Sequence, residues 1–197
     1  MSNISLARLE MEEIARRLRE NTPRAVADEA PPTPEVKCAA VLVPLLMEGG
    51  EWHLLFTRRT DRVESHKGQV SFPGGACDVG EQTAEETALR EAQEEIGLPA
   101  HKVRLIGRLP PMVTISQFRV TPVVGVLEWP LALKVSTVEV ARVFTIPLTW
   151  LADPGNRWEF HHPQRGRLVV YHPFDGELLW GATARMTLML LESLLKS

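Results

Sequence analysis

Three glutamates in the segment 90–98 (REAQEEIGL) are spaced so that they could act together. If this segment is helical, Glu91, Glu94 and Glu95 stand at positions i, i+3 and i+4 and share one face. Like charges at this spacing repel each other, and a divalent cation bound between them would convert the repulsion into attraction. Carboxylate oxygens suit Mg²⁺ or Mn²⁺, which often bind substrate phosphates as well. The segment therefore predicts a metal site formed by Glu91, Glu94 and Glu95.

The surroundings of these glutamates favour a site over an ordinary solvated acidic helix. A Phe-Pro-Gly-Gly turn at residues 72–75 precedes the helix, and its glycines allow close approach of the backbone. Thr83 and Glu86 form a capping-box pattern at the expected start of the helix, and Gly97 is a typical stop. Arg90 can pair with a glutamate four residues away, or can hold a ligand carboxylate in the correct rotamer.

The elements that must position this helix are predicted as strands interleaved with helices. Beside the glutamates, Ala88 and Ala92 form a small apolar face that predicts close packing on a sheet. Strands are expected at 38–46, 52–57, 68–72, 103–109 and 121–127, and a closing helix at 182–195. The segments 138–144 and 168–171 are expected to be strands or helix edges. The turn at 47–50 makes the first two strands a hairpin. This alternation predicts an α/β sandwich.

The chain is expected to divide into an N-terminal appendage, residues 1–35, and a compact domain, residues 36–197. Residues 4–20 predict an amphipathic helix, because Ile4, Ala7, Met11, Ile14 and Leu18 recur at helical spacing. Residues 21–34 contain four prolines and indicate a linker or extended arm. We expect the helix to pack on the domain or on a second subunit, which makes a homodimer one of the expected assemblies.

The composition excludes several functional classes. The 197 residues are 44% hydrophobic and 24% charged, as in an ordinary globular domain. The formal net charge of −3 argues against a nucleic-acid partner, since such proteins usually carry a basic excess. Without a membrane-length apolar run or a secretion signal, a cytoplasmic protein with no membrane partner is expected. Two reduced thiols are the favoured state of Cys38 and Cys77, with a disulfide as the alternative.

The segment 75–98 resembles the Nudix box, G-x5-E-x7-R-E-U-x-E-E-x-G-U, where U is a bulky apolar residue. The matching positions are Gly75, Glu81, Arg90, Glu91, Glu94, Glu95, Gly97 and Leu98. Eight residues instead of seven separate Glu81 from Arg90, and we expect the additional residue in the loop before the helix. The resemblance implies a Nudix-type α/β/α sandwich with a mixed β-sheet. It also implies Mg²⁺ or Mn²⁺ as cofactor, and Arg90, Glu94 and Glu95 as catalytic residues.

Upstream, the segment 54–75 is similar to the signature of the coenzyme A pyrophosphatase branch of the Nudix superfamily, L-L-T-x-R-[SA]-x3-R-x3-G-x3-F-P-G-G. The positions that agree are Leu55, Thr57, Arg59, Gly68 and residues 72–75. Glu64 stands where that signature has arginine, which reverses a charge.

Basic side chains near the Gly-rich turn are candidates for phosphate contacts. The expected substrate-binding residues are Arg58, Arg59, Lys67, Gly74 and Gly75. Arg59 is preferred among the basic residues because it occupies a motif position. Glu139 matches the position of a downstream loop acid in this family, and it is the first candidate for a general base or an additional metal ligand.

The implied activity is metal-dependent hydrolysis of a phosphoanhydride. The branch implies a small nucleotide-diphosphate substrate, coenzyme A or a derivative, split into 3′,5′-ADP and 4′-phosphopantetheine or its acylated form. A second candidate is a Nudix hydrolase of ADP-ribose, a dinucleotide or a nucleoside triphosphate, which Glu64 keeps open. A third, of another class, is a non-catalytic Nudix module that senses a nucleotide. Such modules typically lose box acids, whereas this chain keeps its three helix acids.

Overall fold

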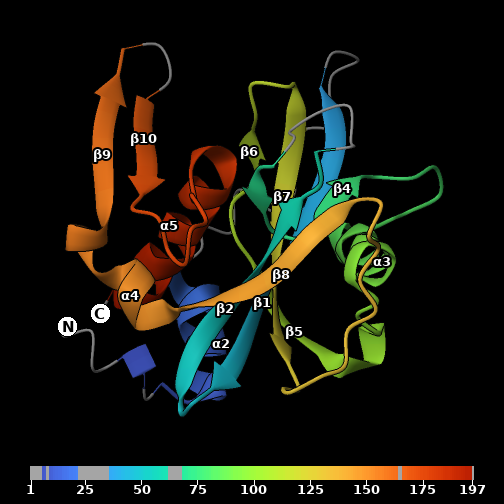
Figure 1. The fold of residues 1–197 in the computed structure, drawn as a ribbon, viewed down its shortest axis with the longest axis horizontal. Coiled ribbons are helices and arrows are strands. Elements are labelled where there is room, and N and C mark those ends of the chain that lie inside the picture. Colours follow the sequence, from blue (N-terminus) through green and yellow to red (C-terminus); the bar gives the residue numbers. More distant parts are fainter. Residues whose placement is uncertain (1–5, 8, 22–35, 62–67, 164–165, 197) are drawn as a thin grey trace.

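The computed structural model describes residues 6–7, 9–21, 36–61, 68–163 and 166–196. A large mixed β-sheet stands between helix α3 on one face and helices α2, α4 and α5 on the other (Figure 1). The expected α/β/α sandwich with a mixed sheet is confirmed. None of the described helices is long and apolar enough to cross a membrane.

The main sheet has eight strands, and most of its strands pair in the order β3-β2-β1-β7-β5. Its members are β1 (Lys37–Glu48), β2 (Glu51–Arg59), β3 (Val70–Ser71), β4 (Gly74–Ala76), β5 (Val103–Arg108), β6 (Met112–Val113), β7 (Phe118–Leu127) and β8 (Val140–Pro147). Strands β1 and β7 pair in parallel, and the other pairings are antiparallel. The middle of β1 is buried on both faces, which explains its continuous run of apolar residues.

The face that matters for the acidic segment is covered by α3 (Ala84–Ile96). Ala88, Ala92 and Ile96 are fully buried there, against apolar side chains of the sheet. The predicted capping box is confirmed, because the Thr83 side chain accepts the Glu86 N–H while Glu86 accepts the Thr83 N–H. Gly97 ends the helix in the left-handed conformation at φ +65°, as predicted. The helix is continuous from Ala84 to Ile96, which is consistent with the additional residue of the box lying in the preceding loop.

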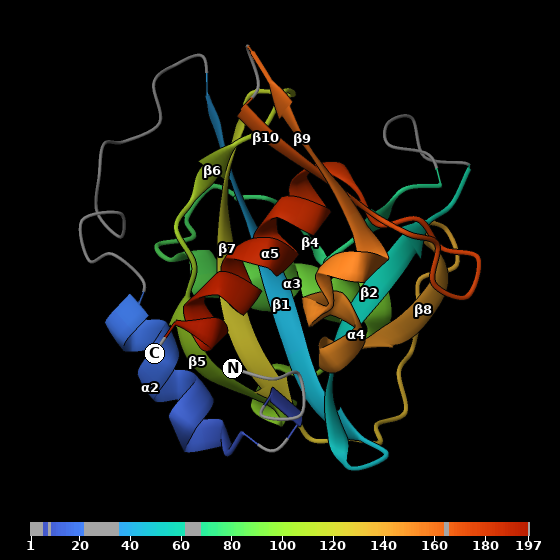
Figure 2. The ribbon, with the colours of Figure 1, turned by 90° about the vertical axis from the view of Figure 1, so that its left-hand side faces the viewer.

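The opposite face carries α5 (Gly181–Leu195), flanked by α2 (Met11–Asn21) and the short α4 (Leu148–Ala152), as Figure 2 shows. The single helix expected over 4–20 is interrupted, because Leu9 and Glu10 are not helical, although residues 6–7 before them are. The Leu9 carbonyl instead accepts a hydrogen bond of 2.7 Å from Trp52 Nε1. Ile4 and the arm at 22–35 lie outside the described residues. The helix itself packs on the domain, with Ile14 and Leu18 in the core.

Beyond β8 the chain forms a small two-stranded sheet that the sequence does not indicate in full. It consists of β9 (Arg157–His162) and β10 (Gly166–Tyr171). Short 3₁₀ helices lie before β5, at Ala100–Lys102, and before β9, at Pro154–Asn156. Strand β10 agrees with the segment expected at 168–171, whereas no element is expected from the sequence at the position of β9. The expected strand at 138–144 begins two residues later and continues into Pro147.

Cys38 and Cys77 form a disulfide, with their Cα atoms 5.4 Å apart. The expectation of two reduced thiols is therefore wrong for this structure. The cause is the antiparallel pairing of β1 with β4, in which Ala39 lies opposite Ala76. This register places Cys38, the residue before Ala39, next to Cys77, the residue after Ala76. The register is a tertiary feature that the linear sequence does not contain.

Candidate active site

Glu95 is the most enclosed of the three helix glutamates. The residue is 2% exposed, and its carboxylate receives the Gly74 N–H at 3.4 Å and the Arg59 guanidinium at 3.5 Å. Burial raises the pKa of Glu95 to about 8 in spite of the attraction of Arg59, and the negative charge of Glu91 adds to the rise. A buried carboxylate with so little compensation is a strong position for a cation.

Glu91 lies one helical turn before Glu95 and directly beneath the Gly-Gly turn. A Cβ atom built on Gly75 would stand only 2.5–2.7 Å from the Glu91 carboxyl group, so that position 75 has no room for a side chain. Burial raises the pKa of Glu91, while hydrogen bonding and attraction from Arg90 oppose the rise. The turn thus covers the carboxylate with backbone alone.

Glu94 is the outer member of the set, since its side chain is more than half exposed. Its carboxylate lies 3.1 Å from Arg90 Nη1, the same nitrogen that donates to Glu91 at 2.9 Å. Arg90 therefore bridges the two glutamates, in agreement with the pairing predicted from the helical spacing.

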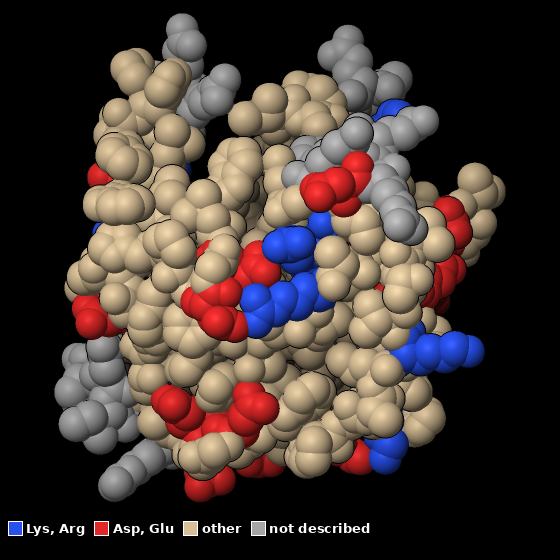
Figure 3. Space-filling view, viewed as in Figure 1, with Lys and Arg blue, Asp and Glu red and all other residues tan. Residues whose placement is uncertain are grey.

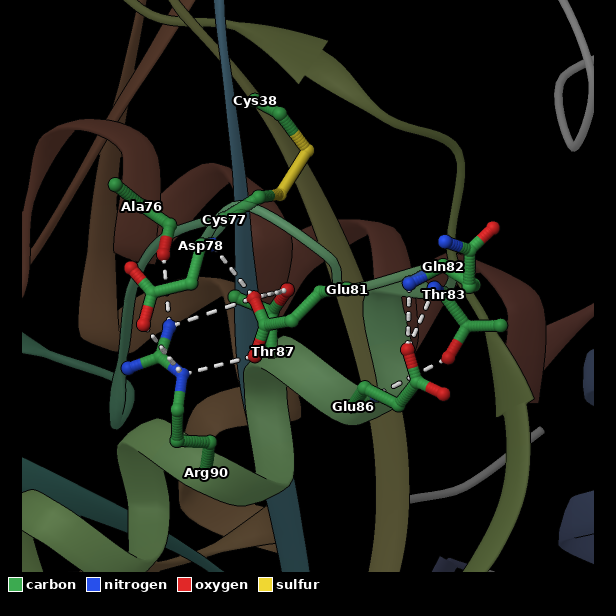
Figure 4. The surroundings of a disulfide bond; sticks show 10 residues. All are labelled: Cys38, Ala76, Cys77, Asp78, Glu81, Gln82, Thr83, Glu86, Thr87 and Arg90. Atoms are coloured by element: carbon green, nitrogen blue, oxygen red, sulfur yellow. Dashed lines mark hydrogen bonds and ion pairs between the residues drawn. A yellow bond between two sulfur atoms is a disulfide. The ribbon is translucent and has the colours of Figure 1, made fainter.

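Arg90 is held from its other side by the loop that precedes α3 (Figure 4). Its Nε donates to Glu81 at 2.8 Å, and its Nη2 donates to the Ala76 carbonyl at 2.9 Å. The hydrogen bond from Arg90 lowers the pKa of Glu81 to about 2, and the Thr87 hydroxyl, which also donates to Glu81, adds to this effect. Glu81 is thus bonded to Arg90 even though the loop is one residue longer than the box pattern.

Two members of this network are not indicated by the sequence. Asp78 lies 3.4 Å from Arg90 Nε, and its N–H donates to Glu81 at 2.7 Å. Thr87 is fully buried on the inner side of α3. The spacing of four residues between the capping Thr83 and Thr87 is the sequence signal that could have indicated that Thr87 faces the interior of the domain.

The two adjacent arginines of β2 separate, because successive residues of a strand point to opposite faces. Arg59 reaches Glu95, as described above. Arg58 instead lies 3.6 Å from the buried Glu177, which also pairs with Arg142 at 3.1 Å. The structure therefore does not bring Arg58 to the carboxylates. Lys67 and Glu64 lie outside the described residues.

Glu139 lies close to the carboxylates although it follows them by more than forty residues. The Thr60 N–H donates to the Glu139 carbonyl at 2.8 Å, which fixes this residue beside the end of β2 that carries Arg59. Its negative charge contributes to the raised pKa of both Glu91 and Glu95. A fourth carboxylate, from a separate part of the chain, therefore acts electrostatically on the acidic group.

The carboxylates do not form a ready-made metal cage. Within the described ranges, no group of three or more His, Cys, Asp or Glu side chains is arranged to hold an ion. Arg90 occupies the space between Glu91 and Glu94, so a cation bound there has to draw at least one of them away. The donor chemistry fits a hard divalent ion, because all the groups are carboxylates and the single 3.5 Å contact from Arg59 does not offset the burial of Glu95. The face of the molecule in Figure 3 is of mixed sign, with basic and acidic side chains next to each other.

Comparison with known families agrees with this fold and acidic helix. A model of the NUDIX domain matches residues 36–164. The chain therefore belongs to the Nudix hydrolase family.

The chain is also similar to individual Nudix proteins, among them two relatives by sequence and one solved structure. The chain is 38% identical over 148 residues to "Uncharacterized Nudix hydrolase NudL" of Photorhabdus laumondii, covering 74% of this chain and 79% of the relative. It is 40% identical over 136 residues to "Peroxisomal coenzyme A diphosphatase NUDT7" of Mus musculus, covering 69% of this chain but only 58% of the mouse protein. A MutT/nudix family protein from Enterococcus faecalis shares the fold, with a TM-score of 0.53 at 14% identity over 92% of this chain and 73% of that one.

Proposed function

We propose that this chain hydrolyses the phosphoanhydride of coenzyme A or an acylated derivative in a divalent-metal-dependent reaction. The observation that carries the proposal is the pair of carboxylates from Glu91 and Glu95 beneath the Gly74-Gly75 turn, with Glu94 bridged to Glu91 by Arg90. The similarity to the mouse protein named as a coenzyme A diphosphatase supports the choice of substrate, and so does the coenzyme A signature at 54–75.

Glu91, Glu94 and Glu95 would hold Mg²⁺ or Mn²⁺. A bound ion of this kind neutralises charge on the diphosphate and makes water a better nucleophile. Arg90 keeps Glu91 and Glu94 oriented through its bonds to Glu81 and to the Ala76 carbonyl. Its position is that of a group that sets the rotamers of the ligands rather than one that touches the substrate.

The remaining polar groups are assigned to the diphosphate and the water. Arg59 offers a guanidinium beside Glu95, and the backbone of Gly74 and Gly75 allows a phosphate to approach closely. Glu139 is the proposed base that accepts the proton of the attacking water. The water oxygen adds to one phosphorus, the bridging P–O bond breaks, and the bridging oxygen leaves with the other phosphate. The products are 3′,5′-ADP and 4′-phosphopantetheine or its acylated form.

Glu64 is the one residue that favours a different substrate from coenzyme A. Glu64 replaces an arginine of the coenzyme A signature. If that arginine contacts a phosphate in other members, ADP-ribose, a dinucleotide or a nucleoside triphosphate could suit this chain better. A non-catalytic nucleotide sensor is the competing function of another class, and the presence of all three helix acids disfavours it.

Product mass separates these functions directly. The protein is incubated with coenzyme A, ADP-ribose, NADH and dGTP in Mg²⁺, and the products are identified by mass spectrometry. The proposal expects 3′,5′-ADP from coenzyme A at the highest rate, and loss of this product in Glu95→Gln. Preferred cleavage of another compound moves the substrate assignment to that compound. Tight coenzyme A binding without any product supports the sensor.

We also propose an oligomeric state and a cellular location for this protein. A homodimer is proposed from the amphipathic N-terminal segment, and light scattering on the full chain tests it. Truncation is a poor test, because Ile14 and Leu18 belong to the core. A cytoplasmic location is proposed from the sequence. Stable disulfides are unusual in the reducing cytoplasm, so the Cys38–Cys77 bond needs an explanation if the protein is located there.

A further inference from the structure

The Cys38–Cys77 disulfide fixes the segment that precedes the acidic helix. It joins the beginning of β1 to the first residue of the loop at residues 77–83, which connects β4 to α3 (Figure 4). The Cys77 N–H also donates to the Cys38 carbonyl at 3.1 Å. Since β4 is only three residues long, the cross-link is the main anchor of this end of the loop.

The same short segment holds Arg90. The Ala76 carbonyl, one residue before Cys77, accepts from Arg90 Nη2. The Asp78 N–H, one residue after Cys77, donates to Glu81, which accepts from Arg90 Nε. Both hydrogen-bond routes to Arg90 therefore begin at a neighbour of Cys77, and Arg90 in turn bonds Glu91 and Glu94.

The disulfide is open to small molecules. Cys38 is exposed and Cys77 is partly exposed, and the next three residues of the loop, Asp78, Val79 and Gly80, are exposed as well. A thiol can therefore reach the bond without unfolding of the core. Loss of the bond leaves this end of the loop held by hydrogen bonds alone, among them those of Glu81 with Arg90 and Thr87 and the exposed bond from the Asp78 N–H.

We propose that Cys38 and Cys77 form a reversible thiol–disulfide site that tunes cation binding by the α3 glutamates through the 77–83 loop. In the disulfide state, Ala76 and Glu81 hold Arg90 in place. In the dithiol state the loop loosens, Arg90 turns further toward Glu91 and Glu94, and it competes with the cation. The cation-binding part of this inference rests on the proposed function, whereas the redox chemistry does not.

The chemical step is a thiol–disulfide exchange. A thiolate of a small dithiol attacks one cystine sulfur, the Cys38–Cys77 bond breaks, and a mixed disulfide forms. The second thiol of the reductant then displaces the protein sulfur. Two electrons and two protons pass to the two cysteines, while the reductant closes into a cyclic disulfide. A small disulfide such as oxidised glutathione reverses the reaction.

The test compares Mn²⁺ binding in the oxidised protein and in the protein reduced with dithiothreitol, with thiol content measured in each sample. Free Mn²⁺ is counted by electron paramagnetic resonance, and hydrogen–deuterium exchange is followed in peptides covering the 77–83 loop. Cys38→Ser represents the open state permanently. Val79→Ser, at the exposed tip of the same loop, is the matched control that keeps both cysteines.

We expect reduction to weaken Mn²⁺ binding by about tenfold, the usual effect of disturbing groups that orient metal ligands. Faster exchange in the loop should accompany the loss. Cys38→Ser should bind like the reduced protein and should ignore reductant, whereas Val79→Ser should respond like the wild type. Loss of thermal stability on reduction without a change in Mn²⁺ affinity would mean that the bond is only a structural cross-link.

Three other results overturn the proposal. They are two free thiols in the air-oxidised protein, equal loop exchange in both redox states, and no Mn²⁺ binding in either state. Substrate is absent from every measurement, so that failure of the coenzyme A assignment leaves the outcome unaffected.

Discussion

The Glu91 carboxyl group occupies the space in which a side chain at position 75 would stand. A Cβ atom on Gly75 would lie 2.5 Å from its nearest oxygen. The glycine is therefore required by the neighbouring acid, because the backbone at this position must lie directly against the carboxylate.

Gly75→Ala should damage activity more than stability. The Glu91 side chain is flexible at its end and can turn away from the new methyl group, but it then leaves its place in the acidic group. We expect kcat/KM to fall by about 100-fold, as for a displacement of about 1 Å at a catalytic site. Steady-state kinetics and thermal unfolding measure the two effects separately. Gly107→Ala, whose Cβ would meet Leu18 at an ordinary 3.6 Å, is the control.

Gly74→Ala should have the opposite balance. Its Cβ would lie 2.5 Å from the Ala40 carbonyl oxygen and 2.6 Å from the Val41 Cα atom, both in the backbone of the central strand. Such a collision is not relieved by a rotamer change. We expect a loss of about 2 kcal/mol or more in the free energy of unfolding, measured in urea. Unfolding at the wild-type urea concentration would show that β4 can move away from β1.

Glu95→Gln should stabilise the metal-free protein at alkaline pH. The pKa of Glu95 is raised to about 8 from the ordinary 4.5, so the folded state keeps a proton that the unfolded state has already lost. This contribution to stability is complete below about pH 4.5 and is lost as the pH rises through 8.

The glutamine variant has no such charge to bury. Its melting temperature in EDTA at pH 9 should exceed that of the wild type by about 5–10 °C, with a much smaller difference at pH 4. Equal melting curves at both pH values would contradict the buried, charged state of Glu95. The same variant should lose hydrolysis in Mg²⁺, so that one substitution gains stability and loses activity.

Arg59→Ala and Arg58→Ala should differ although the residues are adjacent. Arg59 faces Glu95, and removing the charge-assisted contact that we propose it makes with a substrate phosphate should raise KM by about 10- to 100-fold. Arg58 pairs with the buried Glu177, so its removal should lower the melting temperature and leave KM close to the wild-type value. Kinetics on the preferred substrate and thermal unfolding decide between them. A large rise in KM for Arg58→Ala would mean that Arg58 reaches the substrate.

Leu18→Ala tests whether α2 is part of the fold. Leu18 is 1% exposed and belongs to the main core. Its truncation should cost about 2–4 kcal/mol in the free energy of unfolding, as for other buried leucines. Arg19→Ala on the exposed side of the same helix is the control and should change little. An equally small effect at Leu18 would indicate that α2 detaches freely from the domain.

Local sequence signals predict α3 and its acidic face well. The capping pair, the alanine face and the stop at Gly97 all act within a few residues, so they can be recognised without tertiary information. The β1–β2 hairpin is predicted for the same reason, since the Gly49-Gly50 turn has positive φ angles at both residues.

Tertiary partners account for what the sequence does not predict. The disulfide depends on the register of β1 against β4, and the break before α2 depends on the hydrogen bond from Trp52 to Leu9. The alternation of side chains along β2 separates Arg58 from Arg59, but the position of Glu177 decides what Arg58 contacts. Backbone pairing between Thr60 and Glu139 brings a remote acid to the site. Each of these contacts joins segments that are distant along the chain.

Helices α2 and α5 are joined by two hydrogen bonds, which side chains of α2 donate to carbonyl groups in the last turn of α5. Arg17 donates to the Leu194 carbonyl and Asn21 to the Ser193 carbonyl, and the first of these contacts spans 177 residues of sequence. Carbonyls in the last turn of a helix lack partners of their own, so α2 completes the hydrogen bonding of α5. Since contacts so remote are costly to close early, we expect this junction to form late in folding. In a nascent chain on the ribosome, α2 therefore cannot make these two hydrogen bonds until α5 has emerged.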